Sequence, residues 1–385
     1  MTSRWRLCVS LALCSILHGM ASAHPPVVDY HQHLFSPAAL ALVTGNPQSP
    51  GITARDLVAL LDSAGIQRAL VLSVAYTWGK ASRAPVEHEY EHVKAENDWT
   101  AQQVARYPNR LRAFCSVNPL KPYALEELAR CSNDPQLHYG LKLHFGNSDV
   151  DLDNPADVAQ VTNVFEIANR YHMAIVVHMH TSIDKHRRYG ADEARTFLND
   201  VLPAAPDVPV QIAHLAGSGG YDAATDAALS VFADAITRRD PRLKNVWFDV
   251  TTVVQPETPA DELRRIAARI RKIGADRVLY GSDAATTPFA YPSAGWAAFR
   301  RLPLTETEFT TIANNLAPYM RDSGARQTRL TIGVVSSCQE STQYDLRTAP
   351  IGYGSGTPCG RTERSTSIAA TQSAFSRATA MNPRK

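Results

Sequence analysis

The sequence has almost no net charge. Its 39 lysine and arginine residues nearly balance 37 aspartate and glutamate residues, which leaves +2 at neutral pH. Such a balance gives no reason to expect nucleic acid or an anionic membrane surface as a partner. Beyond the first 23 residues, the chain also lacks an apolar run long enough to cross a lipid bilayer. We therefore expect no nucleic-acid partner and no membrane partner.

The first 23 residues have the pattern of a secretory signal peptide. Arginines at positions 4 and 6 precede an apolar stretch over residues 7–17, and the small-x-small sequence Ala21-Ser22-Ala23 follows. We expect cleavage after Ala23, a mature chain that begins at His24, and a secreted or periplasmic protein.

Cysteines are few. Of six in the chain, two lie in the expected signal peptide, and Cys115, Cys131, Cys338 and Cys359 remain. Their spacing is not that of a zinc finger. An oxidising compartment allows disulfides, and four cysteines permit three pairings, which the sequence leaves open. For Cys115, inside the apolar run LRAFCSV, the simplest expectation is a buried free thiol.

Short apolar runs, most of them rich in β-branched residues, recur along the chain. They cover residues 27–34, 68–74, 111–117, 140–145, 174–180, 208–215, 245–251 and 277–283. Continuous apolar character is typical of strands that are covered on both faces.

Helical patterns separate these runs. Thr53 to Asp56 forms a capping-box sequence before leucines at helical spacing, and Asn154-Pro155 opens another helix. Further helices are predicted over 88–106, 123–131, 190–201, 222–238, 259–273 and 305–317.

Eight strands that alternate with helices predict an α/β fold, a (β/α)8 TIM barrel. The alternative is an open doubly wound sheet, which usually has a glycine-rich phosphate turn after its first strand. Here HLFSPAAL follows instead, and the cluster at 217–220 is more typical of a plain loop. We place the barrel at residues 24–324. Residues 325–385, poor in large apolar side chains and rich in Ser, Thr, Gly and Arg, are predicted to be a disordered tail.

Potential ligand side chains gather at the ends of the predicted strands. His31 and His33 are two apart in the first run, so they point to the same side of a strand. The C-terminal ends of barrel strands are where barrel enzymes place their sites. The same ends of four later runs carry the further candidates Lys142, His144, His178, His180, His214 and Asp283.

The ordered set D-x-H-x-H, GLKLH, VVH, IAHL and YGSD resembles the amidohydrolase superfamily, in its amidohydrolase-related branch of metal-dependent TIM-barrel hydrolases. The resemblance covers about residues 27–320 and includes AENDW at 95–99 and SVNPL at 116–120.

This resemblance implies roles for the strand-end residues. His31, His33, His178 and Asp283 would bind a divalent metal, most often Zn²⁺, and Asp283 would also take a proton from the attacking water. His214 would act in catalysis by orienting or polarising the reacting group, or would bind a second ion. Neutral imidazoles and a carboxylate suit Zn²⁺. The resemblance favours one ion over two.

Some positions stay open at this point. Lys142 would be carboxylated between two ions, bind a substrate carboxylate, or pair with Asp283. His144 and His180 are either further ligands or substrate contacts, or hydrogen-bonding residues behind the ligands. The loops after the strands set specificity in barrels, and their candidates are Tyr76, Trp78, Asn118, Asn147 and Ser148.

Three functions compete. The first is a hydrolase that uses metal-activated water on an amide, ester or lactone bond. The second is a lyase of the same superfamily, a decarboxylase or hydratase that acts on an aromatic or unsaturated acid. The third is a non-catalytic barrel that binds a metal or ligand. We expect a small-molecule substrate, and a homo-oligomer is compatible with the sequence.

Overall fold

The computed structural model describes residues 24–80, 82–181, 187–284 and 291–321. The expected signal peptide and the expected C-terminal tail lie outside these residues. Eight strands follow one another along the described chain. They are β1 (Val28–Gln32), β2 (Arg68–Leu72), β3 (Leu111–Ser116), β4 (Gly140–His144), β5 (Ala174–His178), β6 (Val210–Ile212), β7 (Val246–Asp249) and β8 (Val278–Leu279). Each lies within one of the eight predicted runs.

The strands are all parallel and pair in the sequential order β1 to β8. The amide of Tyr30 donates to the carbonyl of Tyr280 at 2.8 Å, and the amide of Asp283 donates to the carbonyl of His31 at 2.8 Å. These two bonds join the segment that follows the last strand to the first strand. The predicted barrel is therefore confirmed, and the sequential order excludes the doubly wound sheet, in which the order reverses.

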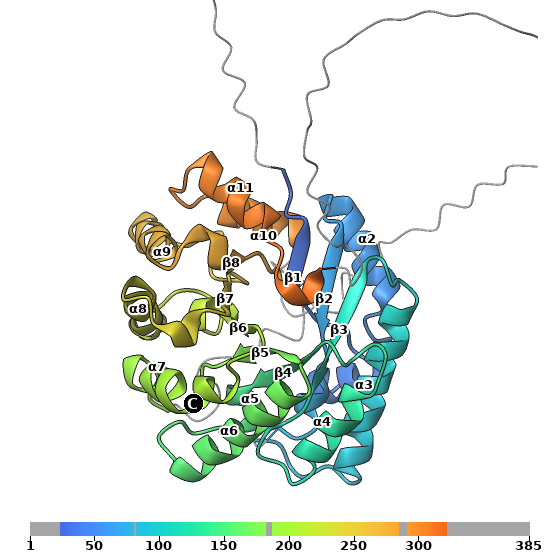
Figure 1. Ribbon diagram of the computed structural model, residues 1–385. Helices are drawn as coiled ribbons and strands as arrows, with labels where there is room; N and C mark the ends of the chain where they lie inside the picture. The colour runs from blue at the N-terminus through green and yellow to red at the C-terminus, as the bar shows by residue number, and fades with distance from the viewer. Residues whose placement is uncertain (1–23, 81, 182–186, 285–290, 322–385) are drawn as a thin grey trace, which may run out of the picture. The chain divides into compact units, whose positions relative to one another are not determined.

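Helices surround the strands on the outside (Figure 1). They are α1 (Pro37–Thr44), α2 (Ala54–Ala64), α3 (Glu89–Ala105), α4 (Ala124–Ser132), α5 (Phe145–Ser148), α6 (Pro155–Arg170), α7 (Ala191–Thr196), α8 (Ala223–Thr237), α9 (Ala260–Ile273), α10 (Pro292–Phe299) and α11 (Glu306–Asn314). The capping box at Thr53 and the N-cap at Asn154 are both present, as predicted. Among the described residues, no helix combines the length and the apolarity needed to cross a membrane.

Two predicted helices need correction, and α1, α5 and α10 were not predicted. The helix expected over 190–201 is α only to Thr196 and continues as a π turn, Phe197–Val201. The helix expected to reach residue 317 ends at Asn314, because Asn315 turns to extended backbone and bonds the carbonyls of Ala275 and Val278. Helix α1 was not predicted, although Ser36 caps it and Pro37 starts it.

Two layers of apolar side chains hold the barrel together. Outward strand residues such as Val71, Val177 and Phe248 pack against the helices. Inward residues, among them Leu70, Phe114 and Val176, fill the barrel floor together with Tyr319 and Met320 of the C-terminal 3-10 turn Pro318–Met320. The floor is thus closed by a segment that follows the eighth strand.

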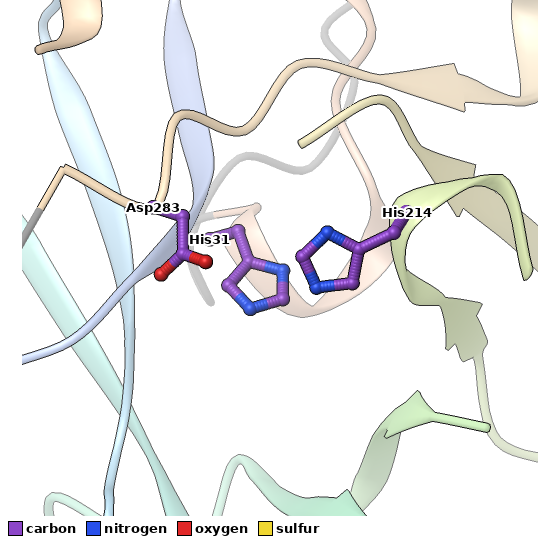
Figure 2. A group of neighbouring side chains, drawn as sticks. All are labelled: His31, His214 and Asp283. Atoms are coloured by element: carbon purple, nitrogen blue, oxygen red, sulfur yellow. The ribbon is translucent and has the colours of Figure 1, made fainter. Parts of the chain in front are cut away.

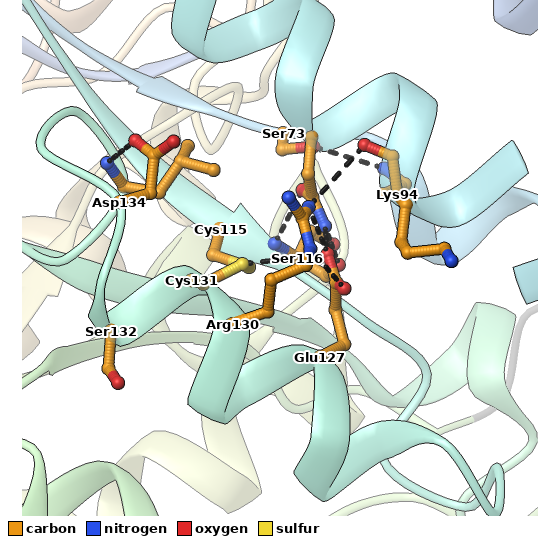
Figure 3. The surroundings of a disulfide bond; sticks show 12 residues. Ser73, Lys94, Cys115, Ser116, Glu127, Arg130, Cys131, Ser132 and Asp134 are labelled. Atoms are coloured by element: carbon orange, nitrogen blue, oxygen red, sulfur yellow. Dashed lines mark hydrogen bonds and ion pairs between the residues drawn. A yellow bond between two sulfur atoms is a disulfide. The ribbon is translucent and has the colours of Figure 1, made fainter. Parts of the chain in front are cut away.

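A disulfide joins Cys115 of β3 to Cys131 of α4 (Figure 3). The expectation of a free buried thiol at Cys115 is therefore wrong. Both cysteines are fully buried, and the Oε1 atom of Glu127 lies 3.6 Å from the Cys131 sulfur. The bond ties a helix to the strand that it covers.

Candidate metal centre

Strand alternation directs the candidate side chains into the barrel. On β4 and β5 the odd-numbered residues pack outward, so Lys142, His144 and His178 face inward. On β1 the same alternation would separate Tyr30 from His31. The pairing of β1 with β2, however, shifts register between Asp29 and Gln32, as at a β-bulge. Tyr30 joins the barrel floor, and His31 still reaches Lys142 across the interior.

Three of the predicted residues form one group. His31, His214 and Asp283 each offer a ligand atom, and these atoms lie within 4.8 Å of one another. In Figure 2 the three side chains converge, with His31 of β1 between His214 and Asp283, which lie in the segments after β6 and β8. The ring centres of His31 and His214 are 4.8 Å apart. Residues 252 positions apart in the sequence thus meet at the junction of the first and last strands.

His33 and His178 border this group. The Nε2 atom of His33 lies 3.7 Å from Oδ1 of Asp283, and the ring centres of His31 and His33 are 5.2 Å apart. The ring of His178 is centred 4.8 Å from that of His214. The structure therefore brings all five predicted ligand and catalytic residues together, and the division of roles among them stays a prediction.

Hydrogen bonds fix the tautomers of three histidines. The Nδ1 atoms of His31, His33 and His214 contact the Asp249 carboxylate at 3.1 Å, the Leu72 carbonyl at 2.7 Å and the Thr251 carbonyl at 2.8 Å. These oxygens only accept hydrogen bonds, so each Nδ1 carries the proton. In the neutral ring Nε2 then has the lone pair, which is the form of imidazole that binds a metal.

Burial keeps the imidazoles neutral. It lowers the pKa of His31 and of His33 to about 3, and the nearby charge of Lys142 acts in the same direction. Burial also lowers the pKa of His144 and His178 well below the ordinary value. At neutral pH no proton competes for these ring nitrogens.

Asp249, which the sequence reasoning did not single out, supports two of the histidines. Its Oδ2 accepts from Nδ1 of His31 and from Nε2 of Gln211, and its Oδ1 accepts from the amides of His214 and Thr251. Burial alone would raise the pKa of this carboxyl, but His31 and the other donors outweigh burial and lower it. A signal existed, because Asp249 is the one charged residue in the predicted strand 245–251.

His214 and Asp283 both sit in left-handed backbone. His214, Leu215 and Ala216 have φ values of 53°, 50° and 66°, and Asp283 has a φ of 58°. Such conformations cost non-glycine residues free energy and cluster at functional sites. Here they follow directly after β6 and β8 and turn the two side chains toward the group.

Gly281 makes this packing possible. A Cβ atom at this position would lie 2.2 Å from Oγ1 of Thr251 and 2.7 Å from Cβ of His31. No side chain fits at those distances. The glycine of the YGSD sequence is thus explained by the close approach of the strand to His31.

Lys142 lies at the centre of the barrel and is fully buried. Its Nζ atom is 3.3 Å from Nε2 of His31. Burial lowers its pKa to about 8, against the opposing charges of Asp249 and Asp283. The contact to His31 was not among the three expectations for Lys142, and those expectations stay predictions.

His144 and His180 lie farther from the group. The ring of His144 stacks on His178 with centres 3.9 Å apart, and its Nδ1 accepts from the amide of Asn147 at 3.2 Å. The ring of His180 packs on Tyr189, at 4.0 Å between centres. For His144, this arrangement fits a residue that packs behind a ligand.

The loop candidates differ in their surroundings. Tyr76 lies over His144, with ring centres 5.0 Å apart, and bonds the side chain of Asn147. Trp78 stacks on His92 at 4.2 Å. Asn118 is buried and ties the loops together by bonding the carbonyls of Gly79 and Ser148 and the amide of Leu120. Among the loop candidates, Tyr76 thus lies against His144, the residue that stacks on His178.

The residues present fit a divalent cation. Neutral imidazole nitrogens and one carboxylate are the donor set that Zn²⁺ prefers. Nε2 of His178 is buried and has no hydrogen-bond partner among the described residues. A buried nitrogen without a partner is costly, and a metal ion would satisfy it.

Comparisons with known proteins agree with the geometry. No curated protein sequence matches the chain. Among solved structures, 5-carboxyvanillate decarboxylase from Sphingomonas paucimobilis has 16% identity and a TM-score of 0.51, over 76% of this chain and 97% of that one. A 2,6-dihydroxybenzoate decarboxylase has 17% identity and a TM-score of 0.53, over 75% and 97%. A probable 2-pyrone-4,6-dicarboxylic acid hydrolase from Acinetobacter baumannii has 16% identity and a TM-score of 0.50, over 74% and 96%.

At these identities the likeness concerns the fold alone. Sequence adds a more specific finding, since the profile of the amidohydrolase family matches residues 28–315, which is most of the chain and holds every candidate ligand. The barrel, the strand-end histidines and this match lead to one conclusion: the chain belongs to the amidohydrolase family.

Proposed function

We propose that this protein is a metal-dependent hydrolase that directs water at an amide, ester or lactone bond of a small molecule. The observation that carries the proposal is the position of Asp283. Its carboxylate shares one group with His31 and His214 and lies 3.7 Å from Nε2 of His33. A base is thereby held beside ring nitrogens of His31, His33 and His214.

Each residue has a part in this chemistry. A divalent cation held there supplies a Lewis acid and makes a bound water more acidic. Asp283 accepts the proton of the attacking water and passes it to the leaving group. His214, protonated on Nδ1, has a lone pair on Nε2, so it binds a cation or accepts a proton there and donates only after it is protonated.

Lys142 favours a second candidate, a decarboxylase or hydratase of a carboxylic acid. Its buried ammonium, 3.3 Å from His31, can bind a substrate carboxylate at the centre of the site. Two of the structural neighbours are named as decarboxylases of aromatic acids. A substrate carboxylate bound here is compatible with both reactions, so the products must distinguish them.

The test measures metal content and turnover of the purified chain from His24 onward. Amides, esters and lactones are assayed for hydrolysis, and aromatic acids for release of CO2. For a hydrolysed substrate, Asp283→Asn should lower kcat by about 10²–10⁴, the usual contribution of a general acid–base. Asp276→Asn, an exposed change just before the N-terminal end of β8, is the matched control and should leave kcat unchanged.

The outcomes separate the candidates. CO2 release without hydrolysis would establish the lyase and reject the hydrolase. Full activity of Asp283→Asn would reject the mechanism. A metal-loaded protein with no turnover on any substrate would favour the non-catalytic barrel.

We also propose that the protein is exported. The pattern of residues 1–23 supports this, as does the Cys115–Cys131 disulfide, since such bonds persist in oxidising compartments. Expression of the full chain in a bacterium should give a periplasmic product whose N-terminal residue is His24. A cytoplasmic product that retains Met1 would contradict export.

A further inference from the structure

The barrel floor contains a polar side chain from the C-terminal end of the described chain. Tyr319, in the turn Pro318–Met320, lies among the floor residues Val28, Leu70, Phe114 and Val176. Its ring packs edge-on against Phe114 at 5.2 Å between centres. In such apolar surroundings its hydroxyl group needs a hydrogen-bond partner.

That partner leads toward the metal centre. The hydroxyl of Tyr319 donates to Oε1 of Gln211, and Nε2 of Gln211 donates to Oδ2 of Asp249 at 2.6 Å. The same Oδ2 atom accepts from Nδ1 of His31 at 3.1 Å. A continuous chain of hydrogen bonds thus runs from the barrel floor to a predicted ligand.

Every link has a fixed direction. The Asp249 carboxylate only accepts, so it requires the amide nitrogen of Gln211 to face it, and the amide oxygen then accepts from the Tyr319 hydroxyl. If the amide turned over, its oxygen would face the Asp249 carboxylate and both groups would repel. Gln211 and Asp249 are fully buried, so water does not replace a lost bond easily.

We propose that Tyr319 is a positioning residue of the metal centre, acting through Gln211 and Asp249 on His31 and His214. Asp249 bonds the Nδ1 of His31 and the backbone amide of His214, so its position affects the orientation of the His31 ring and the backbone that carries His214. Partners behind a metal ligand commonly change metal affinity by about 10–100-fold. The inference rests on the proposed metal site and assigns part of it to the segment that follows the eighth strand.

The chain offers a matched control in Tyr30. Its hydroxyl is also in the barrel floor, where it donates to the carbonyl of Asn315 and accepts from the amide of Ala317, and its ring meets Tyr319 at 6.0 Å. Tyr30→Phe and Tyr319→Phe each remove one hydroxyl from the same cluster and keep the ring. Only Tyr319→Phe removes the bond to Gln211.

The experiment measures Co²⁺ and Zn²⁺ affinity of the metal-free protein by competition with a chromophoric chelator, and the visible spectrum of the Co²⁺ form. Tyr319→Phe should weaken binding about tenfold and alter the Co²⁺ bands, whereas Tyr30→Phe should change affinity less than about threefold. The melting temperatures of the two metal-free variants should fall by similar amounts. Equal metal affinity and equal spectra for the two variants would overturn the proposal.

A second pair of variants tests whether Tyr319 acts through Gln211. Gln211→Leu should itself weaken metal binding, and adding Tyr319→Phe to it should cause no further loss, because the connecting amide is gone. Tyr319→Phe alone leaves Oε1 of Gln211 buried without its donor, whereas the double variant removes both the donor and the acceptor. The double variant is therefore expected to fold even where Tyr319→Phe alone does not. A further loss in the double variant would contradict action through Gln211. Failure of the unaltered protein to bind either metal would instead reject the proposed metal site.

Discussion

The Nζ atom of Lys142 lies 3.3 Å from Nε2 of His31, the ring nitrogen that is otherwise available to a metal ion. The pKa of Lys142 is lowered to about 8, so the ammonium form still predominates at pH 7. This ammonium both bonds the nitrogen and repels a dication. The position of Lys142 therefore bears directly on how many ions the centre holds.

Lys142→Met should strengthen binding of a single Zn²⁺ ion by about tenfold or more, because a hydrogen bond from a charged group contributes about 1.5–3 kcal/mol. Competition with a chelator at pH 7 measures the change. Lys121 lies in the loop after β3 and forms an ion pair with Glu89. Lys121→Met is the control and should leave Zn²⁺ affinity unchanged. A fall from two bound ions to one would show instead that Lys142 bridges two ions.

His178→Asn should lower metal affinity by more than the roughly 10–100-fold that is typical of residues behind the ligands. The reason is the buried Nε2 of His178, which has no partner among the described residues. Mass spectrometry of the dialysed protein gives the metal content. His180 lies two residues later and packs on Tyr189, so His180→Asn should bind as many metal ions per chain as the unaltered protein. Equal losses in the two variants would contradict the assignment of His178.

The metal-free protein should lose stability as the pH falls below 6.5. In the unfolded chain histidine binds protons near pH 6.5, whereas the pKa of His31 and of His33 is about 3 in the folded state. Between these values the unfolded state binds more protons, so each imidazole removes about 1.4 kcal/mol per pH unit. Urea midpoints of EDTA-treated protein from pH 7 to pH 5 measure the loss.

Carboxyls whose pKa is raised by burial, such as Asp29 and Glu96, act in the opposite direction. Burial raises the pKa of Asp29 to about 6, so below that pH the folded state takes up a proton and part of the loss is offset. His33→Asn should reduce the pH dependence by about one proton. His88→Asn, at an exposed side chain, should leave it unchanged. A urea midpoint that did not vary over this range would contradict the burial of neutral histidines.

Removing the disulfide should destabilise the barrel without altering its metal content. The two cysteines are 16 residues apart, and a loop of about 15 residues corresponds to about 3 kcal/mol in the chain-entropy treatment. Cys115→Ala, Cys131→Ala and the double variant should all lose the same amount, because either single change breaks the bond. Chemical unfolding under oxidising conditions measures this. Losses of the two single variants that add up in the double variant, or no loss at all, would contradict the bond.

The strands could be predicted because a barrel strand is covered on both faces and its residues are continuously apolar. That character belongs to the local sequence, and all eight runs contain a strand. Helix α1 was equally local, since Ser36-Pro37 is a helix start, and was missed because it follows the first strand directly. The C-terminal boundary of α11 depends on Asn315 bonding Ala275 and Val278, which is a tertiary contact.

The candidate site could be predicted only in part for the same reason. The spacing of two placed His31 and His33 correctly. Tyr30 shares the interior with them because of the bulge in β1, which the amino-acid sequence does not reveal. Asp249 had a local signal, a carboxylate in an apolar strand. Tyr319 had none, because it meets Gln211 across 108 residues and only the closed barrel brings them together.

The position of the centre at the junction between β8 and β1 links metal binding to the closure of the barrel. There the amide of Asp283 bonds the carbonyl of His31, and the two side chains lie in one ligand group. An ion bound by both side chains would add a further link between the start and the end of the barrel, beside the backbone hydrogen bond. Because the ion would bind only the closed barrel, its binding free energy would add to the free energy of unfolding. Metal occupancy and stability should therefore rise together.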